Sequence, residues 1–184
     1  MLLGIDSTCN DVKLIRTPCP HCGARGRYKR HGSYKRYLVD VNDSKPIEAR
    51  IVITRVRCLS CRRTHALLPS NAVAHSSLSV SFCASVLAAY LGPTQTVETV
   101  SFQHGVSART IYRIASGLTK IRCVIGMGVS LEQTQKRLIA IVNNAEILTS
   151  FVAEFLFKFA ATPFQYVTLP KVTLWCDGGI AAIT

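Results

Sequence analysis

Apolar residues follow two different spacings along the chain, and each spacing predicts a different kind of element. In residues 33–39 and 47–57, aromatic and β-branched residues occur in runs with partial alternation, which predicts two strands. The cluster N-D-S-K-P at residues 42–46 is typical of a turn and lies between them. We therefore expect a β-hairpin here. In its second strand the alternation predicts one face with Ile51 and Ile53 and another with Val52, Thr54 and Val56.

From Leu78 the spacing becomes helical. Apolar residues recur every four positions as far as Tyr90, and the glycine-proline pair that follows should end this first helix. Thr96 is a suitable cap for a short second helix. The stretch Q-H-G-V-S at residues 103–107 then combines a glycine, which suits a left-handed helix end, with a serine that can cap the next helix.

A third helix should run from Ser107 to about Leu118. A short helix, a glycine turn and a helix with a basic outer face follow the order of a helix-turn-helix, whose second helix contacts base edges in DNA. The alternative is a plain core helix whose arginines are only solvated. The expected buried stripe is Ile111, Ile114, Ala115 and Leu118, and the expected DNA contacts are Ser107, Arg109, Thr110, Tyr112 and Arg113.

The C-terminal third is less informative. A wide apolar stripe between Leu148 and Phe159 should be buried against the core or against a second copy, so a homodimer through this C-terminal helix is one expectation. Residues 138–161 are too polar for a membrane span, because they include Asn143, Asn144, Glu146, Glu154 and Lys158. Residues 162–184 predict an irregular or strand-like tail. No phosphate-binding loop, dinucleotide motif or small-molecule site is evident.

Two C-x-x-C pairs, at residues 19–22 and 58–61, carry the candidate chemistry. A thioredoxin-like redox site needs a βαβ pattern around one pair, and none is present. Residues 1–6 lack the basic region of a secretory signal, so we expect a cytoplasmic protein, in which disulfides do not persist. Two tight turns with four thiolates match one structural Zn²⁺. The predicted ligands are Cys19, Cys22, Cys58 and Cys61; His21, His31 and His65 are alternative ligands that are more simply solvated or base-contacting.

The formal net charge is +12, and most basic residues surround the predicted hairpin. Between residues 13 and 63, fourteen lysines and arginines face only three acidic residues. This excess suggests a polyanionic partner. Three interleaved tyrosines, Tyr28, Tyr34 and Tyr37, can stack on bases or line the sheet. The predicted phosphate contacts are Lys29, Arg30, Lys35, Arg36, Arg62 and Arg63.

Four stretches carry a resemblance to a known family: C-P-H-C-G, H-G-S-Y-K-R-Y, R-V-R-C-L-S-C-R-R-T-H-A-L-L-P and G-V-S-A-R-T-I-Y-R-I. They resemble the zinc-ribbon and helix-turn-helix front end of certain bacterial transposases and, more narrowly, a bacterial family with a domain of unknown function often labelled transposase-like. The resemblance covers about residues 16–120 and implies DNA binding by both modules and zinc on the four cysteines. It does not imply catalysis, because such transposases carry a carboxylate triad in a later ribonuclease-H-like domain. In this chain the only acidic residues after position 118 are Glu132, Glu146, Glu154 and Asp177. The sequence between them predicts helices rather than the strands that would carry such a triad.

Together these features predict an α+β protein with three parts. A β zinc ribbon occupies residues 1–72, an all-helical helix-turn-helix domain residues 73–125, and a helical extension with an irregular tail residues 126–184. The expected function is zinc-dependent binding of double-stranded DNA without enzymatic activity. Two alternatives are open: a truncated or accessory transposase component, and an RNA-binding or adaptor ribbon in which the basic hairpin, rather than Arg109 and Arg113, dominates affinity.

Overall fold

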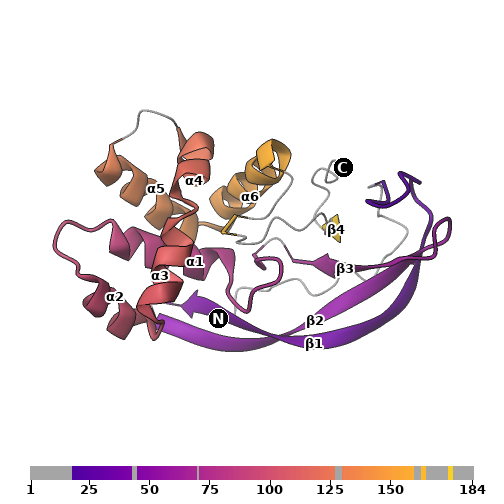
Figure 1. Ribbon diagram of the computed structural model, residues 1–184, viewed down its shortest axis with the longest axis horizontal. Coiled ribbons are helices and arrows are strands. Elements are labelled where there is room, and N and C mark those ends of the chain that lie inside the picture. The colour runs from indigo at the N-terminus through magenta and orange to yellow at the C-terminus, as the bar shows by residue number, and fades with distance from the viewer. Residues whose placement is uncertain are drawn as a thin grey trace.

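In the computed structural model the chain folds as an α+β protein, with most strands before the helices (Figure 1). This confirms the α+β class of the prediction, while the zinc ribbon and the helix-turn-helix domain stay predictions. The structure describes residues 18–42, 45–69, 71–126, 130–159, 163–164 and 174–175. The strands are β1 (Tyr28–Asn42), β2 (Lys45–Cys58), β3 (Thr64–Leu68) and the two-residue β4 (Leu174–Trp175). The helices are α1 (Val80–Tyr90), α2 (Val97–His104), α3 (Ala108–Ala115), α4 (Leu118–Ile125), α5 (Leu131–Asn143) and α6 (Ala145–Phe159).

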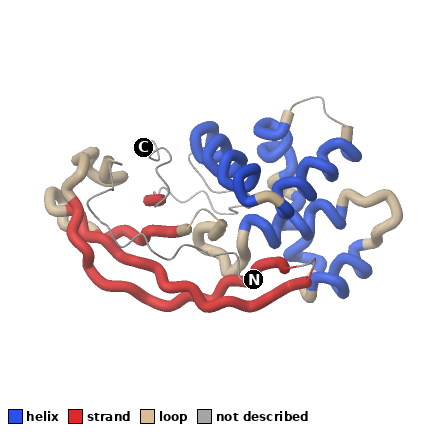
Figure 2. Tube along the Cα trace, turned by 180° about the vertical axis from the view of Figure 1, so that it is seen from behind, coloured by secondary structure: helices blue, strands red, loops and turns tan. Residues whose placement is uncertain are grey.

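The β1–β2 hairpin is long and curved, with the cysteine-containing turns at one end and the helices at the other (Figures 1 and 2). Its antiparallel register runs from Tyr28 opposite Cys58 to Asn42 opposite Lys45. β3 pairs antiparallel with β2, and β4 pairs parallel with β3. The predicted hairpin is therefore present and longer than expected, while residues 43 and 44 of the predicted turn lie outside the described residues.

Burial along β2 follows the two predicted faces in its first half only. Ile51 and Ile53 are buried and Val52 is exposed, whereas Thr54 and Val56, placed on the same face as Val52, are buried. At the cysteine end of the sheet, β3 pairs with residues 54–57 of β2, and a bulge shifts the β1 register between residues 30 and 32. The buried positions of β2 change there from Ile51 and Ile53 to Val56 and Cys58.

Helix α1 is the centre of the helical part. Ser79 caps it by accepting a hydrogen bond from the backbone N–H of Phe82, and the helix contacts α2, α3, α5 and β1. Cys83 is a small buried residue of α1, and burial raises the pKa of its thiol. Polar contacts near Asp40 join the sheet to α1: its carboxylate accepts hydrogen bonds from Ser79 Oγ at 2.7 Å and Asn71 Nδ2 at 3.1 Å.

The third helix is shorter than predicted. It ends at Ala115, because Ser116 and Gly117 form a turn in which Ser116 Oγ donates to the carbonyl of Arg113, and a separate helix, α4, begins at Leu118. The apolar stripe of α6 is buried within the chain: Phe151, Val152 and Phe155 are at most 5% exposed and belong to the helical core. A homodimer stays a prediction, as do the three domain boundaries.

The described part of the 162–184 tail is Pro163, Phe164 and strand β4, and the remainder lies outside the described residues. No described helix has, by itself, the length and apolar composition to cross a membrane. Helix α5 and residues Ala145–Phe155 of α6 reach that length and apolar composition only when they are taken together, and the two segments are bent by 114° relative to each other.

Candidate metal centre and nucleic-acid surface

The two C-x-x-C pairs form two tight turns of the same shape. In the first turn the N–H of Gly23 donates to the carbonyl of Cys19 at 2.7 Å, and in the second the N–H of Arg62 donates to the carbonyl of Cys58 at 3.0 Å. The residue after each second cysteine is left-handed, with φ of 71° at Gly23 and 64° at Arg62. Glycine adopts a positive φ readily, so Gly23 suits its position, whereas nothing in the residue type indicates a positive φ at Arg62.

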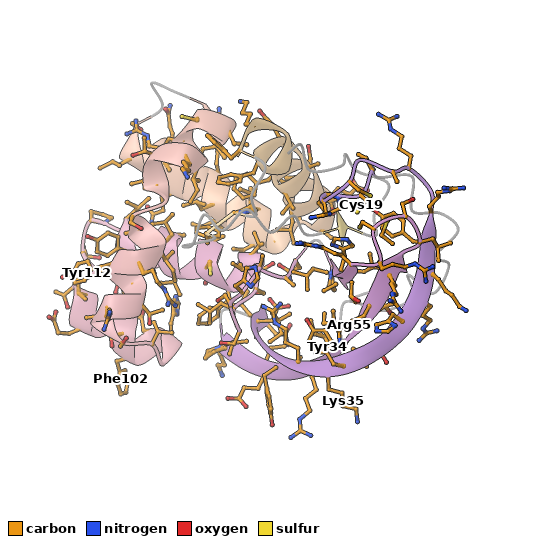
Figure 3. The ribbon with its side chains drawn as sticks, turned by 45° about the vertical axis from the view of Figure 1, so that its right-hand side comes forward. Cys19, Tyr34, Lys35, Arg55, Phe102 and Tyr112 are labelled. Carbon is orange, nitrogen blue, oxygen red and sulfur yellow. The ribbon has the colours of Figure 1, made fainter. Side chains whose placement is uncertain are left out.

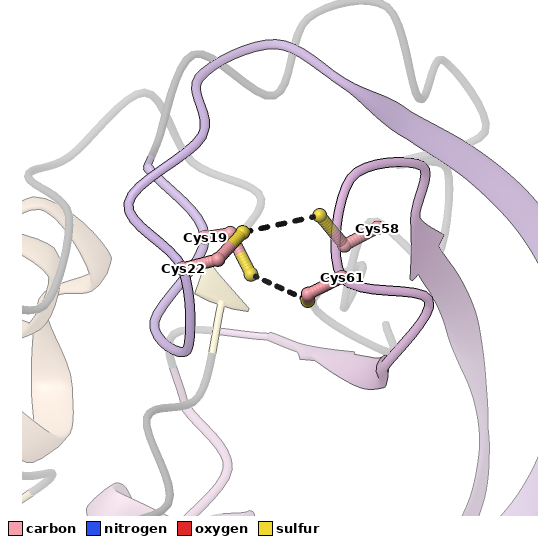
Figure 4. Close-up of side chains that lie close together, drawn as sticks. All are labelled: Cys19, Cys22, Cys58 and Cys61. Atoms are coloured by element: carbon pink, nitrogen blue, oxygen red, sulfur yellow. Dashed lines mark hydrogen bonds between the residues drawn. The ribbon is translucent and has the colours of Figure 1, made fainter.

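The four predicted ligands come together in space (Figure 4). The sulfur atoms of Cys19, Cys22, Cys58 and Cys61 all lie within 4.8 Å of one another, and Cys19–Cys61 and Cys22–Cys58 are each 3.7 Å apart. A disulfide would need about 2.05 Å. A Zn–S distance of about 2.3 Å gives a sulfur–sulfur edge of about 3.8 Å in a tetrahedron. The cluster can therefore hold one metal ion, and its spacing fits zinc.

The thiols of the cluster affect one another's ionisation. Burial raises the pKa of Cys58, but the N–H groups of Cys61 and Ser60 outweigh burial and lower it to about 7. At Cys22 the N–H of Ala24 lowers the pKa, whereas burial and the neighbouring thiols raise it to about 12. Four thiolates this close repel one another, so full ionisation needs a cation between them.

Two side chains from the sheet surround the cluster. His65 Nε2 lies 3.4 Å from Cys19 Sγ, which is close enough for an N–H···S hydrogen bond. The ring of Tyr28 packs edge-on against the ring of His65, with 6.3 Å between the ring centroids. Burial and the charges of Cys19 and Cys58 raise the pKa of the Tyr28 hydroxyl. With four sulfurs present, His65 is better placed to orient a ligand than to replace one. The sequence did not reveal this supporting role.

The predicted phosphate contacts on the hairpin do not share one face. Lys35 points outward from the convex side of the curved sheet, whereas Tyr34 lies on the concave side (Figure 3). Arg36 is half-buried, and its guanidinium donates to the carbonyl of Val73 at 2.7 Å. Arg36 is thus held by the fold and is a poorer choice for an outer phosphate contact. The exposed members of the predicted set are Lys29, Arg30, Lys35, Arg62 and Arg63.

Helices α2 and α3 are joined as the sequence predicted. Thr96 caps α2 by accepting from the N–H of Thr99, Gly105 ends it in the left-handed conformation with φ of 62°, and Ser107 caps α3 by accepting from the N–H of Thr110. Ser101 Oγ also donates to the carbonyl of Val106 at 2.6 Å and so tightens the turn. These cap and turn predictions are confirmed.

The two faces of α3 differ as expected. Ile111 and Ile114 are buried, and the opposite face is mostly exposed. Thr110 is half-buried, and its hydroxyl lies 3.1 Å from Ser107 Oγ. Tyr112 is 55% exposed but packs edge-on against Tyr90 at 6.4 Å. The exposed members of the predicted set here are Ser107, Arg109, Tyr112 and Arg113.

Residues 19–114 match the protein family described as Domain of unknown function (DUF6431). The chain belongs to this family. The matched segment begins at the first clustered cysteine and ends on α3, so in this DUF6431 protein it contains both the cysteine turns and the α2–α3 pair. No curated protein and no solved structure matches the chain. The expected assignment to a domain of unknown function is confirmed, and the likeness to transposases stays a prediction.

Two residues in the family segment have environments that the periodicity did not indicate. Phe102 on α2 is 90% exposed and points away from the helices (Figure 3). His104, only two residues later, is buried with its ring 6.0 Å from that of Phe82, and burial lowers its pKa. Positions two residues apart are separated by about 200° around an α-helix, so Phe102 and His104 lie on opposite faces of α2.

Proposed function

We propose that this chain is a zinc protein that binds double-stranded DNA. The cysteine cluster would be the metal site of a zinc ribbon, and α2 and α3 would form a helix-turn-helix. The observation that carries the proposal is the exposed face of α3, where Arg109 and Arg113 stand one turn apart above the buried Ile111 and Ile114. A recognition helix needs this arrangement, with one face fixed to the core and basic side chains free to contact bases.

The role of zinc in this proposal is structural. Four cysteine sulfurs complete a closed tetrahedral site, which leaves no position for a substrate or an activated water molecule. The metal would join the start of β1 to the end of β2 and so hold Lys29 and Arg30, which follow Tyr28 on β1, beside the second cysteine turn. Arg62 and Arg63 belong to that turn and would add to one basic end of the hairpin.

A role without catalysis is part of the same proposal. Glu132 pairs with Lys136 at 2.6 Å and Glu154 with Lys158 at 2.9 Å, each four residues along an exposed helix face. Within the part of the chain that the structure describes, the group of potential metal ligands is the cysteine cluster, and no carboxylate belongs to it. Asp177 lies outside the described residues. The paired glutamates are thus better explained as helix-surface residues.

The test is a selection from randomised duplex DNA with the full-length, zinc-loaded chain, followed by titration of the selected and a scrambled duplex. Arg109→Ala and Arg113→Ala should reduce discrimination at particular base pairs by about 1–3 kcal/mol each. Lys29→Ala and Lys35→Ala should weaken binding to both duplexes and lower the salt slope by about 0.9 per lost phosphate contact.

Arg137→Ala is the matched control, because Arg137 is an exposed arginine on α5, outside both surfaces. It should bind both duplexes like the unchanged protein. If the selection enriches no sequence and binding is equally weak for duplex and for unrelated polyanions, the DNA-binding proposal is wrong. If the hairpin variants lose specificity and the α3 variants do not, the ribbon is the part that contacts bases.

A further inference from the structure

A second basic surface lies on the concave side of the sheet, opposite Lys35. A groove of about 690 Å³ opens there between β1, β3, the first cysteine turn, Arg63 beside the second turn, and the loop of residues 74–77. None of the fourteen described residues that line it is acidic. The residues that matter for binding are two arginines, Arg36 and Arg63, three histidines, His21, His65 and His75, and Tyr34.

The two arginines supply permanent positive charge, because a guanidinium does not lose its proton in proteins. Arg36 is already oriented by its hydrogen bond to the carbonyl of Val73, and that one bond leaves further N–H donors of the side chain for a ligand. Among the described residues the recorded ion pairs are those of Lys136 and Lys158, so no carboxylate neutralises either arginine. A groove of this kind favours an anion that can accept several hydrogen bonds.

Tyr34 adds an apolar surface to the same groove. Its side chain is 42% exposed and lies on the concave side of β1, one residue before Lys35 on the convex side (Figure 3). Beside it, Ala66 and Leu68 of β3 contribute apolar lining. An aromatic ring next to two cations is the combination that binds a base and its phosphate in single-stranded nucleic-acid sites.

The loop of residues 74–77 connects this groove to α3. His75, Ser76 and Ser77 line the groove on one side and a smaller cavity of about 240 Å³ on the other, and Arg113 of α3 lines that smaller cavity. Basic side chains therefore continue from α3 across the loop into the concave side. At about 690 Å³ the groove has the size of a small-ligand site, about 300–1,000 Å³, and not of a duplex.

We propose that the concave groove binds a single nucleotide unit, with its phosphate contacted by Arg36 and Arg63 and its base stacked on Tyr34. The unit has two sources, a free mononucleotide or an unpaired nucleotide in a DNA strand. The continuity with Arg113 favours the unpaired strand, and that choice of source rests on the proposed DNA binding. The proposal that the groove binds a nucleotide rests on the residues that line it and does not depend on DNA binding by α3.

The experiment uses the full-length, zinc-loaded chain and three probes: a 5′-phosphorylated hexathymidine, thymidine monophosphate and a blunt duplex. The hexathymidine should bind more tightly than the mononucleotide. Tyr34→Leu should weaken hexathymidine binding about five- to 150-fold, as expected for loss of one stacked base, while Tyr34→Phe should bind it like the unchanged protein. Arg63→Gln should weaken it about tenfold or more, with zinc content measured for each variant.

Lys35→Ala is the matched control, because it changes the next residue on the opposite face. It should weaken duplex binding and change hexathymidine binding by less than about twofold at 0.15 M salt. If Tyr34→Leu binds hexathymidine as tightly as Tyr34→Phe, the groove assignment is wrong. Equal affinity for mononucleotide and hexathymidine would overturn the strand as the source. If the α3 variants lose duplex binding but still bind hexathymidine, the duplex is bound by the helix-turn-helix and the nucleotide by the groove. That result supports the groove proposal.

Discussion

The two cysteine turns place different residues in the same strained backbone conformation. Gly23 has φ of 71° and Arg62 has φ of 64°. Glycine adopts this region without steric cost, whereas an L-residue pays about 1–2 kcal/mol. Gly23→Ala and Arg62→Gly therefore change the same conformational strain in opposite directions, and both turns fold around the metal site, so zinc affinity should report the change.

The magnitude follows from the contacts at each site. A Cβ at Gly23 meets no atom within 4 Å, so Gly23→Ala adds strain without a clash. Alanine also restricts the unfolded chain, which returns about 0.4–1 kcal/mol. The middle of the two ranges leaves a net loss of about 0.8 kcal/mol, which corresponds to zinc binding about fourfold weaker. Arg62→Gly keeps the N–H bond to Cys58 and the carbonyl that accepts from Arg57, so it should tighten zinc binding by a similar factor.

The assay is competition for zinc with a chromophoric chelator at neutral pH, with DNA titrations in parallel. Arg62→Gly also removes a predicted phosphate contact, so its DNA affinity should fall and its salt slope should drop by about 0.9 while zinc binding tightens. Arg63→Gly is the control, because residue 63 is not among the positive-φ positions. The strain argument fails if Gly23→Ala holds zinc as tightly as the unchanged protein, or if Arg62→Gly and Arg63→Gly change zinc affinity alike.

Removal of zinc by a chelator should expose the amides of residues 18–30 and 56–63 to hydrogen exchange, while those around Leu38, in a separate apolar cluster with Ile51 and Ile53, stay protected. Equal loss of protection along the whole hairpin would contradict this. Burial lowers the pKa of His104, so the unfolded state binds the proton more readily and stability should fall as pH drops from about 7 to about 5. His104→Gln should flatten that slope in denaturant titrations; an unchanged slope would show that His104 is not its source.

Local signals in the sequence were sufficient for the turns and the helix caps. The roles of Thr96, Gly105 and Ser107 depend on hydrogen bonds to residues three or four positions away. Such local bonds can be predicted from the residue type at each position. The metal site could also be predicted from the sequence, because two C-x-x-C pairs are typical of the ligands of a structural zinc ion. The positive φ of Arg62 was the exception, since only its likeness to Gly23 could have indicated it.

Features that depend on distant segments were not predictable. Arg36 looked like one more exposed base of the hairpin, and only the position of Val73, thirty-seven residues later, fixes the orientation of its guanidinium. Val56 is buried at the end of β2 that pairs with β3, and alternation along one strand cannot indicate this later pairing. The break after Ala115 was missed because Ser116 and Gly117 interrupt a stripe whose apolar spacing continues into α4.

The junction at Asp40 determines how the hairpin and α3 can act on the same DNA. The backbone of Val39 donates to the carbonyl of Ser77 at 2.7 Å and accepts from the N–H of Ser79 at 2.9 Å, and Asp40 adds the side-chain bond to Ser79. Since α3 packs on α1, this junction fixes Lys35 relative to Arg109. Asp40→Ala should cost about 1–3 kcal/mol of stability. It should also weaken duplex binding in the folded protein, although Asp40 is not a predicted DNA contact. The hairpin and α3 would no longer be held in one fixed relative position, so they would bind the same duplex together less tightly. Glu48→Ala, an exposed acid on β2, should do neither. Unchanged duplex affinity of folded Asp40→Ala would mean that the hairpin and α3 bind DNA independently of each other.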